Sequence, residues 1–297
     1  LAGADLEDAD ISTAIYKYED LVGVVKNLDR AIRNIPKINL RFEELCSTVK
    51  KIGGSHIRHV AVLDNRRQVV YESKNNNKPD LGNDYTIMKE MGWIHWQVKK
   101  EHGRLSGIHG KLVGYPEYWN EKYERLNLIS IPIDTYHIIF ITADLNLDHE
   151  SIIAYTLENK VNIESDLPLK VITSFKQLED ASNKGAPKVA DFTEFCNNIC
   201  TLKGVLYANI FNRGGTMSSA AKVSLEPEGI NESVHKALKL RTLREKFEGI
   251  TGKIEYVAVQ YQKTKRIAIY FGDYLLYVVT ESCSDYKKVI EKVYGGR

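Results

Sequence analysis

The stretch KIEYVAVQYQKTKRIAIYFGDYLLYVVTE, residues 253–281, contains three apolar runs separated by short polar turns. Valine, isoleucine and tyrosine dominate these runs, and β-branched and aromatic residues of this kind favour strands. We predict strands at Ile254–Gln260, Arg266–Phe271 and Leu275–Thr280, joined in this order as an antiparallel meander. Nearly every residue of Tyr274–Val279 is apolar, which is typical of a central strand covered on both faces.

The meander belongs to a longer series of elements in the second half of the chain. Strand-like runs on either side of Asn212-Arg213-Gly214-Gly215 predict a β-hairpin, and helical spacing of apolar residues marks the other segments. The predicted elements are a helix at Phe192–Leu202, strands at Val205–Phe211 and Thr216–Lys222, a helix at Asn231–Glu248, the meander, and a closing helix at Asp285–Tyr294.

The first half of the chain repeats this order. A predicted helix at Leu40–Ile52 ends at Gly53-Gly54, and glycine is common directly after a helix. The elements that follow are strands at Ile57–Leu63 and Gln68–Ser73, a helix at Tyr85–His102, strands at Lys111–Tyr115, Leu126–Pro132 and His137–Ala143, and a helix that Asp148 caps and that runs to about Glu158.

Short matches between the two halves indicate an internal duplication. The matches lie at similar places in the order of elements, and their offset drifts slowly, as short loop insertions would cause. The fold class is therefore α/β (α+β), with two similar five-stranded antiparallel sheets covered by helices. The aligned segments are Ala61–Arg66 with Ala208–Arg213, Gly110–Leu112 with Gly252–Ile254, and Ile141-Thr142 with Val279-Thr280.

The duplication sets the expected domain boundaries. An acidic leader and a helix occupy residues 1–35, the first domain residues 36–165, and the second domain residues 191–297. The connector is residues 166–190. Its segment Asn183–Pro187 contains Gly185 and Pro187 and is the expected hinge.

Composition excludes several classes of protein. The 297 residues have a net charge of +2, so no global charge attracts nucleic acid or a membrane surface. No run of 18 apolar residues predicts a transmembrane helix. The four cysteines are too few for a disulfide scaffold, and we expect Cys196 and Cys200 to be buried free thiols. We expect a cytoplasmic protein.

The repeated order of elements resembles the roadblock/LC7 fold, within the profilin-like group that includes longin domains. Gly252–Tyr256, Gln262–Ile267 and Asp273–Glu281 also resemble an uncharacterised family of ammonia-oxidising archaea. Asn120–Leu126 keeps only part of the basic strand start of that family. Roadblock and longin proteins are dimerising platforms, often for small GTPases and their regulators, so the resemblance implies a scaffold that binds a protein partner.

Motifs of catalysis and of cofactor binding are absent from the sequence. There is no phosphate-binding loop, no G-x-G-x-x-G, no H-E-x-x-H and no G-x-S-x-G. His95, His102 and His109 lie near the end of a predicted helix, where the helix dipole favours histidine without a metal. We therefore predict no enzyme activity, no cofactor and no metal site.

Two groups of residues are candidates for an interface. Trp93 and Trp96 are three apart on the predicted helix of the first half, and they fit either the core or a binding surface. The corresponding helix of the second half carries a basic face, which is either simply solvated or a patch for an acidic partner or nucleic acid. The basic candidates are Lys236, Lys239, Arg241 and Arg244.

These observations favour a non-enzymatic interaction module in which two roadblock-like domains pair within one chain. The alternative is a pair of sensory domains of the PAS/GAF type that bind a small molecule near Trp93, Trp96 and Tyr115. Such domains usually have several helices between their second and third strands, whereas one helix is predicted here. Nucleic-acid binding through the basic helix is a further alternative, with less support because stacking aromatics do not accompany the basic residues.

Overall fold

The structure is a computed structural model. It describes residues 36–65, 68–75, 116–134, 137–165, 191–212, 215–222 and 244–295, together with single residues and short runs between 78 and 95 and between 237 and 242. The chain divides into two compact units, Leu1–Glu44 and Leu45–Arg297. The second unit contains the β-sheet, and the sections below concern it. The helix predicted at residues 14–34, the connector at residues 166–190 and the hinge lie outside the described residues.

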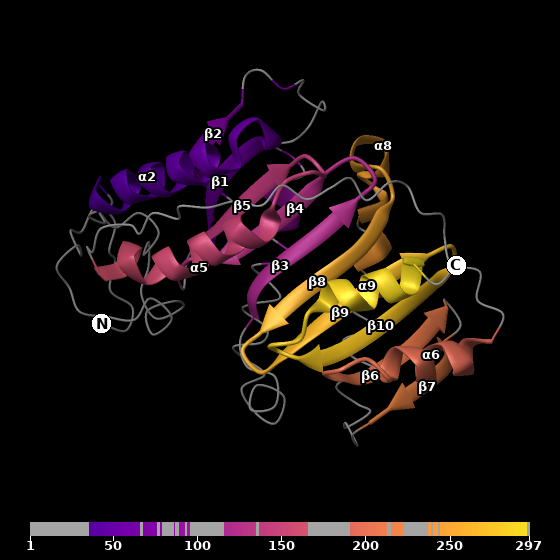
Figure 1. The fold of residues 1–297 in the computed structure, drawn as a ribbon. Helices are drawn as coiled ribbons and strands as arrows, with labels where there is room; N and C mark the ends of the chain where they lie inside the picture. The colour runs from indigo at the N-terminus through magenta and orange to yellow at the C-terminus, as the bar shows by residue number, and fades with distance from the viewer. Residues whose placement is uncertain are drawn as a thin grey trace, which may run out of the picture. The chain divides into compact units, whose positions relative to one another are not determined.

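Ten strands form one sheet in the order β2-β1-β5-β4-β3-β8-β9-β10-β6-β7 (Figure 1). Every pair of neighbours is antiparallel. The strands are β1 (Ile57–Asp64), β2 (Val69–Lys74), β3 (Pro116–Tyr123), β4 (Asn127–Pro132), β5 (His137–Ala143), β6 (Val205–Asn212), β7 (Gly215–Ala221), β8 (Ile254–Tyr261), β9 (Thr264–Phe271) and β10 (Tyr274–Glu281).

Helices precede, separate and follow these strands in the sequence. The predicted strand and helix types are confirmed at most of these positions, and β5 has the predicted bounds. Helical residues are also described between Thr86 and His95 and between Ala237 and Glu245, which we call helix segments 86–95 and 237–245. The helices with stated bounds are α2 (Pro36–Gly53), the short 3-10 helix η1 (Gly54–His56), α5 (His149–Ser165), α6 (Phe192–Cys200), α8 (Glu248–Thr251) and α9 (Tyr286–Gly295).

Strand β3 differs from the prediction. The strand predicted at Lys111–Tyr115 lies outside the described residues, and the structure has a strand at Pro116–Tyr123, which was not predicted. The polar residues Asn120 and Glu121 of this strand are both buried. Their burial is possible because other elements supply hydrogen-bond partners. Proline is also tolerated as the first residue of a strand.

The two halves of the sheet have the same strand order. The first half (β1–β5) is ordered β2-β1-β5-β4-β3, and the second half (β6–β10) is ordered β7-β6-β10-β9-β8. The α+β fold class is confirmed. The two five-stranded sheets are joined edge to edge through β3 and β8 into a single sheet.

Matching rows of paired residues show which positions of the two halves are equivalent. Each row starts in a segment of the sequence alignment, at Ala61 or Ala208, and follows paired residues across the sheet to Trp119 or Ala258. Trp119 is therefore equivalent to Ala258. The rows are Ala61–Phe140–Ser130–Trp119 and Ala208–Val278–Ile267–Ala258.

The pairing of β3 with β8 is symmetric under this equivalence. Trp119 pairs with Val259, and Asn120 pairs with Ala258. Since Trp119 is equivalent to Ala258 and Asn120 to Val259, a local twofold axis passes between these two pairs. An edge that meets its own equivalent in this way has the geometry of a symmetric dimer interface.

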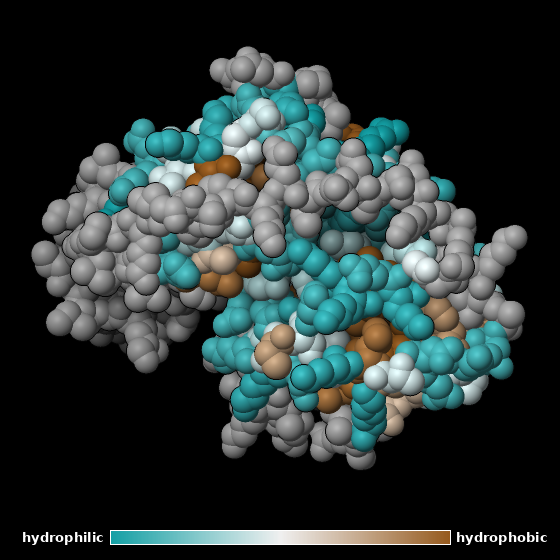
Figure 2. Space-filling view, viewed as in Figure 1, coloured by the Kyte–Doolittle hydropathy of each residue, from teal (hydrophilic) through white to brown (hydrophobic). Residues whose placement is uncertain are grey.

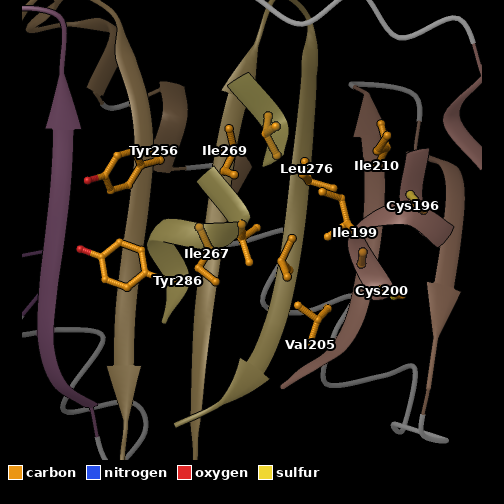
Figure 3. Packing of buried hydrophobic residues seen from close by; sticks show 14 of the residues in the cluster. Cys196, Ile199, Cys200, Val205, Ile210, Tyr256, Ile267, Ile269, Leu276 and Tyr286 are labelled. Carbon is orange, nitrogen blue, oxygen red and sulfur yellow. The ribbon is translucent and has the colours of Figure 1, made fainter. Parts of the chain in front are cut away.

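Helices pack on both faces of the sheet. One face, which we call face A, carries α5, α6 and α9 (Figure 1). Apolar residues of α6 and α9 pack there against the strands of the second half. The packed residues include Ile199 of α6, Ile267 of β9 and Leu276 of β10 (Figure 3). Hydrophobic side chains also reach the surface of this face between α9 and α6 (Figure 2). The opposite face, face B, packs against helix segments 86–95 and 237–245 through residues such as Met91 and Leu238.

The turn from β3 to β4 packs against the start of β8. Glu124 donates its backbone N–H to the carbonyl of Lys253, and Arg125 donates to that of Thr251. Between these two, Gly252 has a φ of +72°, which favours glycine. A Cβ on Gly252 would lie 2.6 Å from the Cβ of Glu124. The close approach of the two halves at this end of the junction therefore requires glycine.

We predict that Gly252→Ala lowers the free energy of unfolding by about 1–3 kcal/mol, because the left-handed backbone and the contact with Glu124 are both strained. Urea denaturation followed by circular dichroism measures the loss. Gly249→Ala is the control, since a Cβ there meets nothing within 4 Å. Equal stability of the two variants would contradict the prediction.

Candidate functional site at the sheet junction

The middle of the sheet, where β3 meets β8, brings chemically active side chains from both halves together. Successive residues of a strand point to opposite faces. Asn120 therefore points to face A and Glu121 to face B. Both side chains are buried, with exposed fractions of 1% and 0%.

On face B, three residues surround the carboxylate of Glu121 and make four polar contacts with it. Arg244 donates through Nε to Oε2 at 3.2 Å and through Nη2 to Oε1. The hydroxyl of Tyr123 donates to Oε2 at 2.7 Å, and Nε2 of His95 lies 2.9 Å from Oε1. The second ring nitrogen of His95 lies 2.7 Å from the hydroxyl of Ser130. The carboxylate thus receives charge-assisted hydrogen bonds at both oxygens.

Electrostatic interactions determine which groups of this cluster are charged. Burial alone would raise the pKa of Glu121, but Arg244 and His95 outweigh burial and hold the pKa well below its usual value. Burial lowers the pKa of His95 and outweighs the opposing effect of Glu121. His95 is therefore neutral, so its Nε2–H donates to Glu121 and its Nδ1 accepts from Ser130. The ring also stacks on Trp119, with centroids 4.9 Å apart and planes 2° apart.

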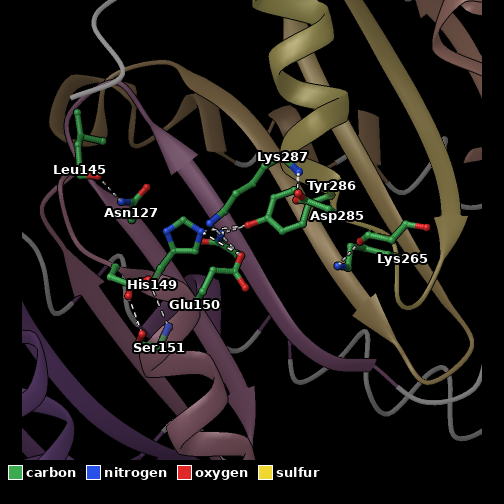
Figure 4. Close-up of polar contacts among 12 residues, drawn as sticks. Asn127, Leu145, His149, Glu150, Ser151, Lys265, Asp285, Tyr286 and Lys287 are labelled. Carbon is green, nitrogen blue, oxygen red and sulfur yellow. Dashed lines mark hydrogen bonds and ion pairs between the residues drawn. The ribbon is translucent and has the colours of Figure 1, made fainter. Parts of the chain in front are cut away.

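On face A, the first turns of α5 and α9 meet, with His149 and Glu150 beside Tyr286 and Lys287 (Figure 4). The hydroxyl of Tyr286 accepts a hydrogen bond from Nδ2 of Asn120 at 2.9 Å, and Nε2 of His149 lies 3.1 Å from the same hydroxyl. Glu150 Oε1 lies 3.5 Å from Nε2 of His149 and 3.9 Å from the ammonium of Lys287. Like Glu121, Asn120 therefore belongs to the first half and binds a residue of the second.

The charge of Glu150 is maintained at this position. Burial favours a raised pKa, but the contacts with His149 and Lys287 outweigh it and lower the pKa to about 2. Burial also raises the pKa of the Tyr286 hydroxyl well above its usual value, which keeps the hydroxyl protonated. Polar contacts on both faces thus link the two halves across one strand pair.

An open cavity of about 980 Å³ lies at the end of the sheet junction. Its walls come from the β3–β4 turn (Glu124, Arg125), from helix segment 237–245, and from the β9–β10 turn at Gly272-Asp273. Charges of both signs line it, so it has no clear preference for an anion or a cation. It is not the enclosed apolar cavity that the sensory alternative requires.

The structure places two of the six predicted interface residues. Arg241 is partly buried: its Nη2 donates to the carbonyl of Gly272 at 2.7 Å, and its Nε lies 3.3 Å from Glu245. Arg244 is only 3% exposed. The sequence suggested a solvated basic face for Arg244, but the side chain is inside the molecule because it neutralises Glu121. The remaining four residues lie outside the described part: Trp93, Trp96, Lys236 and Lys239.

Sequence reasoning missed the residues that form the junction. Glu121 had a detectable signal, since it is a charged residue between aromatic residues at Trp119 and Tyr123. Tyr286 and His149 had none, because each begins an ordinary helix and their meeting depends on tertiary structure. Cys196 and Cys200 are buried free thiols, as predicted.

Metal sites and membrane spans were sought in the whole described part of the chain. Among the described residues, no group of three or more histidine, cysteine or acidic side chains could hold a metal ion. No helix within the described part of the chain is long and apolar enough to cross a membrane.

Comparisons with known proteins gave structural matches only. No family model matches the sequence, and no curated protein matches it. The chain is similar to a solved structure described as MglB with tetrameric arrangement, at 11% identity and a TM-score of 0.35 over 43% of this chain and 91% of that one. It is also similar to a roadblock/LC7 domain from Streptomyces avermitilis, at 15% identity and a TM-score of 0.31 over 35% of this chain and 89% of that one.

A third match is MglB of Myxococcus xanthus, at 10% identity and a TM-score of 0.33 over 46% of this chain and 90% of that one. Each of the three matches covers less than half of this chain.

We predict that Arg244→Met lowers the free energy of unfolding by about 3–5 kcal/mol, because it leaves the buried carboxylate of Glu121 without its cation. The double variant E121M/R244M should recover most of this loss, since it removes both charges and keeps similar volume. Urea denaturation of wild type, R244M, E121M and the double variant measures the coupling. If the double variant is as unstable as the sum of both single variants, the two residues are not a coupled pair.

A second prediction concerns pH. The folded-state pKa of Glu121 is below its unfolded value of about 4.3, so the ionised carboxylate stabilises the fold above that value, and this contribution is lost as the pH falls. Wild type should be more stable than E121Q at pH 7, and the difference should shrink below about pH 5. Urea midpoints from pH 7 to pH 3 provide the test. A difference that stays constant over this range would refute the assignment.

Proposed function

We propose that the chain is a non-enzymatic protein-interaction module, built as a pair of roadblock-like domains that pair within one polypeptide. The observation that carries the proposal is the symmetric β3–β8 ladder, which joins two halves of identical strand order about a local twofold axis. Two separate chains would form a symmetric dimer in this geometry. Here the covalent connection makes the pairing intramolecular and raises its effective concentration.

The proposed surface for a partner is on face B. Both Arg244 of helix segment 237–245 and His95 of helix segment 86–95 reach Glu121. The two segments therefore flank the junction and offer a surface to which both halves contribute. The interface residues proposed from the sequence lie within or directly next to these stretches in the sequence: Trp93, Trp96, Lys236, Lys239 and Arg241.

The proposed partner is a small GTPase or another signalling protein in the cytoplasm. The roadblock resemblance of the sequence supports this class of partner. The basic residues Lys236 and Lys239 favour an acidic surface on the partner, because opposite charges steer association and fix orientation. A scaffold role requires no catalytic residue in the chain.

We predict that K236E/K239E weakens partner binding at least about tenfold, since reversed charges oppose an acidic surface on the partner. The full chain serves as bait in a lysate of the source organism, with GDP or a GTP analogue added. The captured protein is then purified, and its dissociation constant is measured by calorimetry for wild type and variant. The matched control is K288E/K292E, which reverses two exposed charges of α9 on face A.

Two outcomes would count against the proposal. A purified partner that binds K236E/K239E as tightly as wild type would place the interface elsewhere. The absence of any protein that binds the purified full chain directly would remove the scaffold role altogether. Urea unfolding of both variants verifies that the substitutions leave the fold intact.

A further inference from the structure

Some contacts across the junction join unlike residues at positions that the local symmetry makes equivalent. Helices α5 and α9 show this most clearly. Asp148 caps α5, accepting the hydroxyl of Ser151 at 2.6 Å, and Asp285 caps α9, accepting the N–H of Lys287 at 3.0 Å. Each helix begins one residue after its capping aspartate. The first helical residues, His149 and Tyr286, are therefore equivalent.

The equivalent residues meet one another across the axis. His149 lies 3.1 Å from the hydroxyl of Tyr286, and at the next position Glu150 lies 3.9 Å from Lys287. If the halves were identical, each residue would meet its own copy. Two glutamates or two lysines would then face each other, and like charges at such a contact are unfavourable.

The two halves also differ at equivalent positions on face B, and the contacts there are more deeply buried. The equivalence of Trp119 with Ala258 makes Glu121 equivalent to Gln260. The second half therefore has an amide where the first half has a carboxylate. Arg244 of the second half binds Glu121 of the first, with side-chain exposures of 2% and 0%.

A second copy of either half would be a poor partner for this edge. Two first halves would bury two Glu121 carboxylates without Arg244. Two second halves would place Arg244 opposite Gln260 and would give Tyr286 a valine, Val259, in place of Asn120. Each arrangement leaves a buried charge or hydroxyl without its partner, which is strongly unfavourable.

We propose that the β3 and β8 edges are mutually selective: each edge accepts the other half of the chain and rejects a second copy of itself. The selectivity depends mainly on Glu121 with Arg244, and on Asn120 with Tyr286. Glu150 with Lys287 adds less, because this pair is partly exposed and screened by salt. This inference rests on the proposed function, since it concerns the pairing that forms the module.

The test begins with the folded full chain. A protease site is inserted within Asn183–Pro187, the predicted hinge, and the folded protein is then cleaved. The product is mixed with an isotope-labelled copy, incubated until fragments exchange, and weighed by native mass spectrometry. We expect complexes of one N-terminal with one C-terminal fragment, with pairs of identical fragments at roughly a hundredth of this level or less.

Two variants sharpen the test. E121M/R244M replaces the buried ion pair with side chains that tolerate their own copies, so identical fragments should pair at least about tenfold more than in wild type. The matched control is E150K/K287E, which exchanges the two charges and keeps them complementary. Its distribution should equal that of wild type.

The outcomes separate this inference from the proposed function. Pairs of identical wild-type fragments in the proportions of random association would overturn the selectivity and leave the paired module intact. Fragments that separate into monomers would overturn both. A distribution for E121M/R244M that equals that of wild type would overturn the role of the buried ion pair.

Discussion

The burial of Glu121 in the middle strand of the sheet is the constraint on which the rest of the structure depends. A carboxylate removed from water is very unfavourable unless a cation and hydrogen-bond donors replace the water. The cation is Arg244, which lies 123 positions later in the chain. The first half of the sheet therefore cannot bury its own edge strand without the second half.

This constraint also determines the register of the junction. Asn120 and Glu121 are consecutive and point to opposite faces, and each binds a different helix region of the second half. A slip of β3 by one residue would exchange the faces of all its side chains. Glu121 would then face Tyr286 and Asn120 would face Arg244. The two polar contacts together exclude this alternative, whereas an apolar edge would tolerate it more readily.

The sequence correctly predicted the strands whose own residues indicate that they are buried. β5 and β10 are nearly all apolar, and the structure buries both at the middle of their halves. β3 was missed because Asn120 and Glu121 bind partners that are distant in the sequence, and no local pattern reveals such partners. For the same reason Arg244 looked like one member of a solvated basic face.

The asymmetry of the junction affects the chain while it is being synthesised. The first half leaves the ribosome before Arg244 has been made, and domains generally fold in this N-terminal-first order. During this interval its exposed β3 edge is open to pairing with other chains, as any free edge strand is. Glu121 opposes such pairing, because an incoming first half brings a second carboxylate and no cation. The residue that makes the finished junction depend on the second half thus also protects the unfinished chain from association with its own copies.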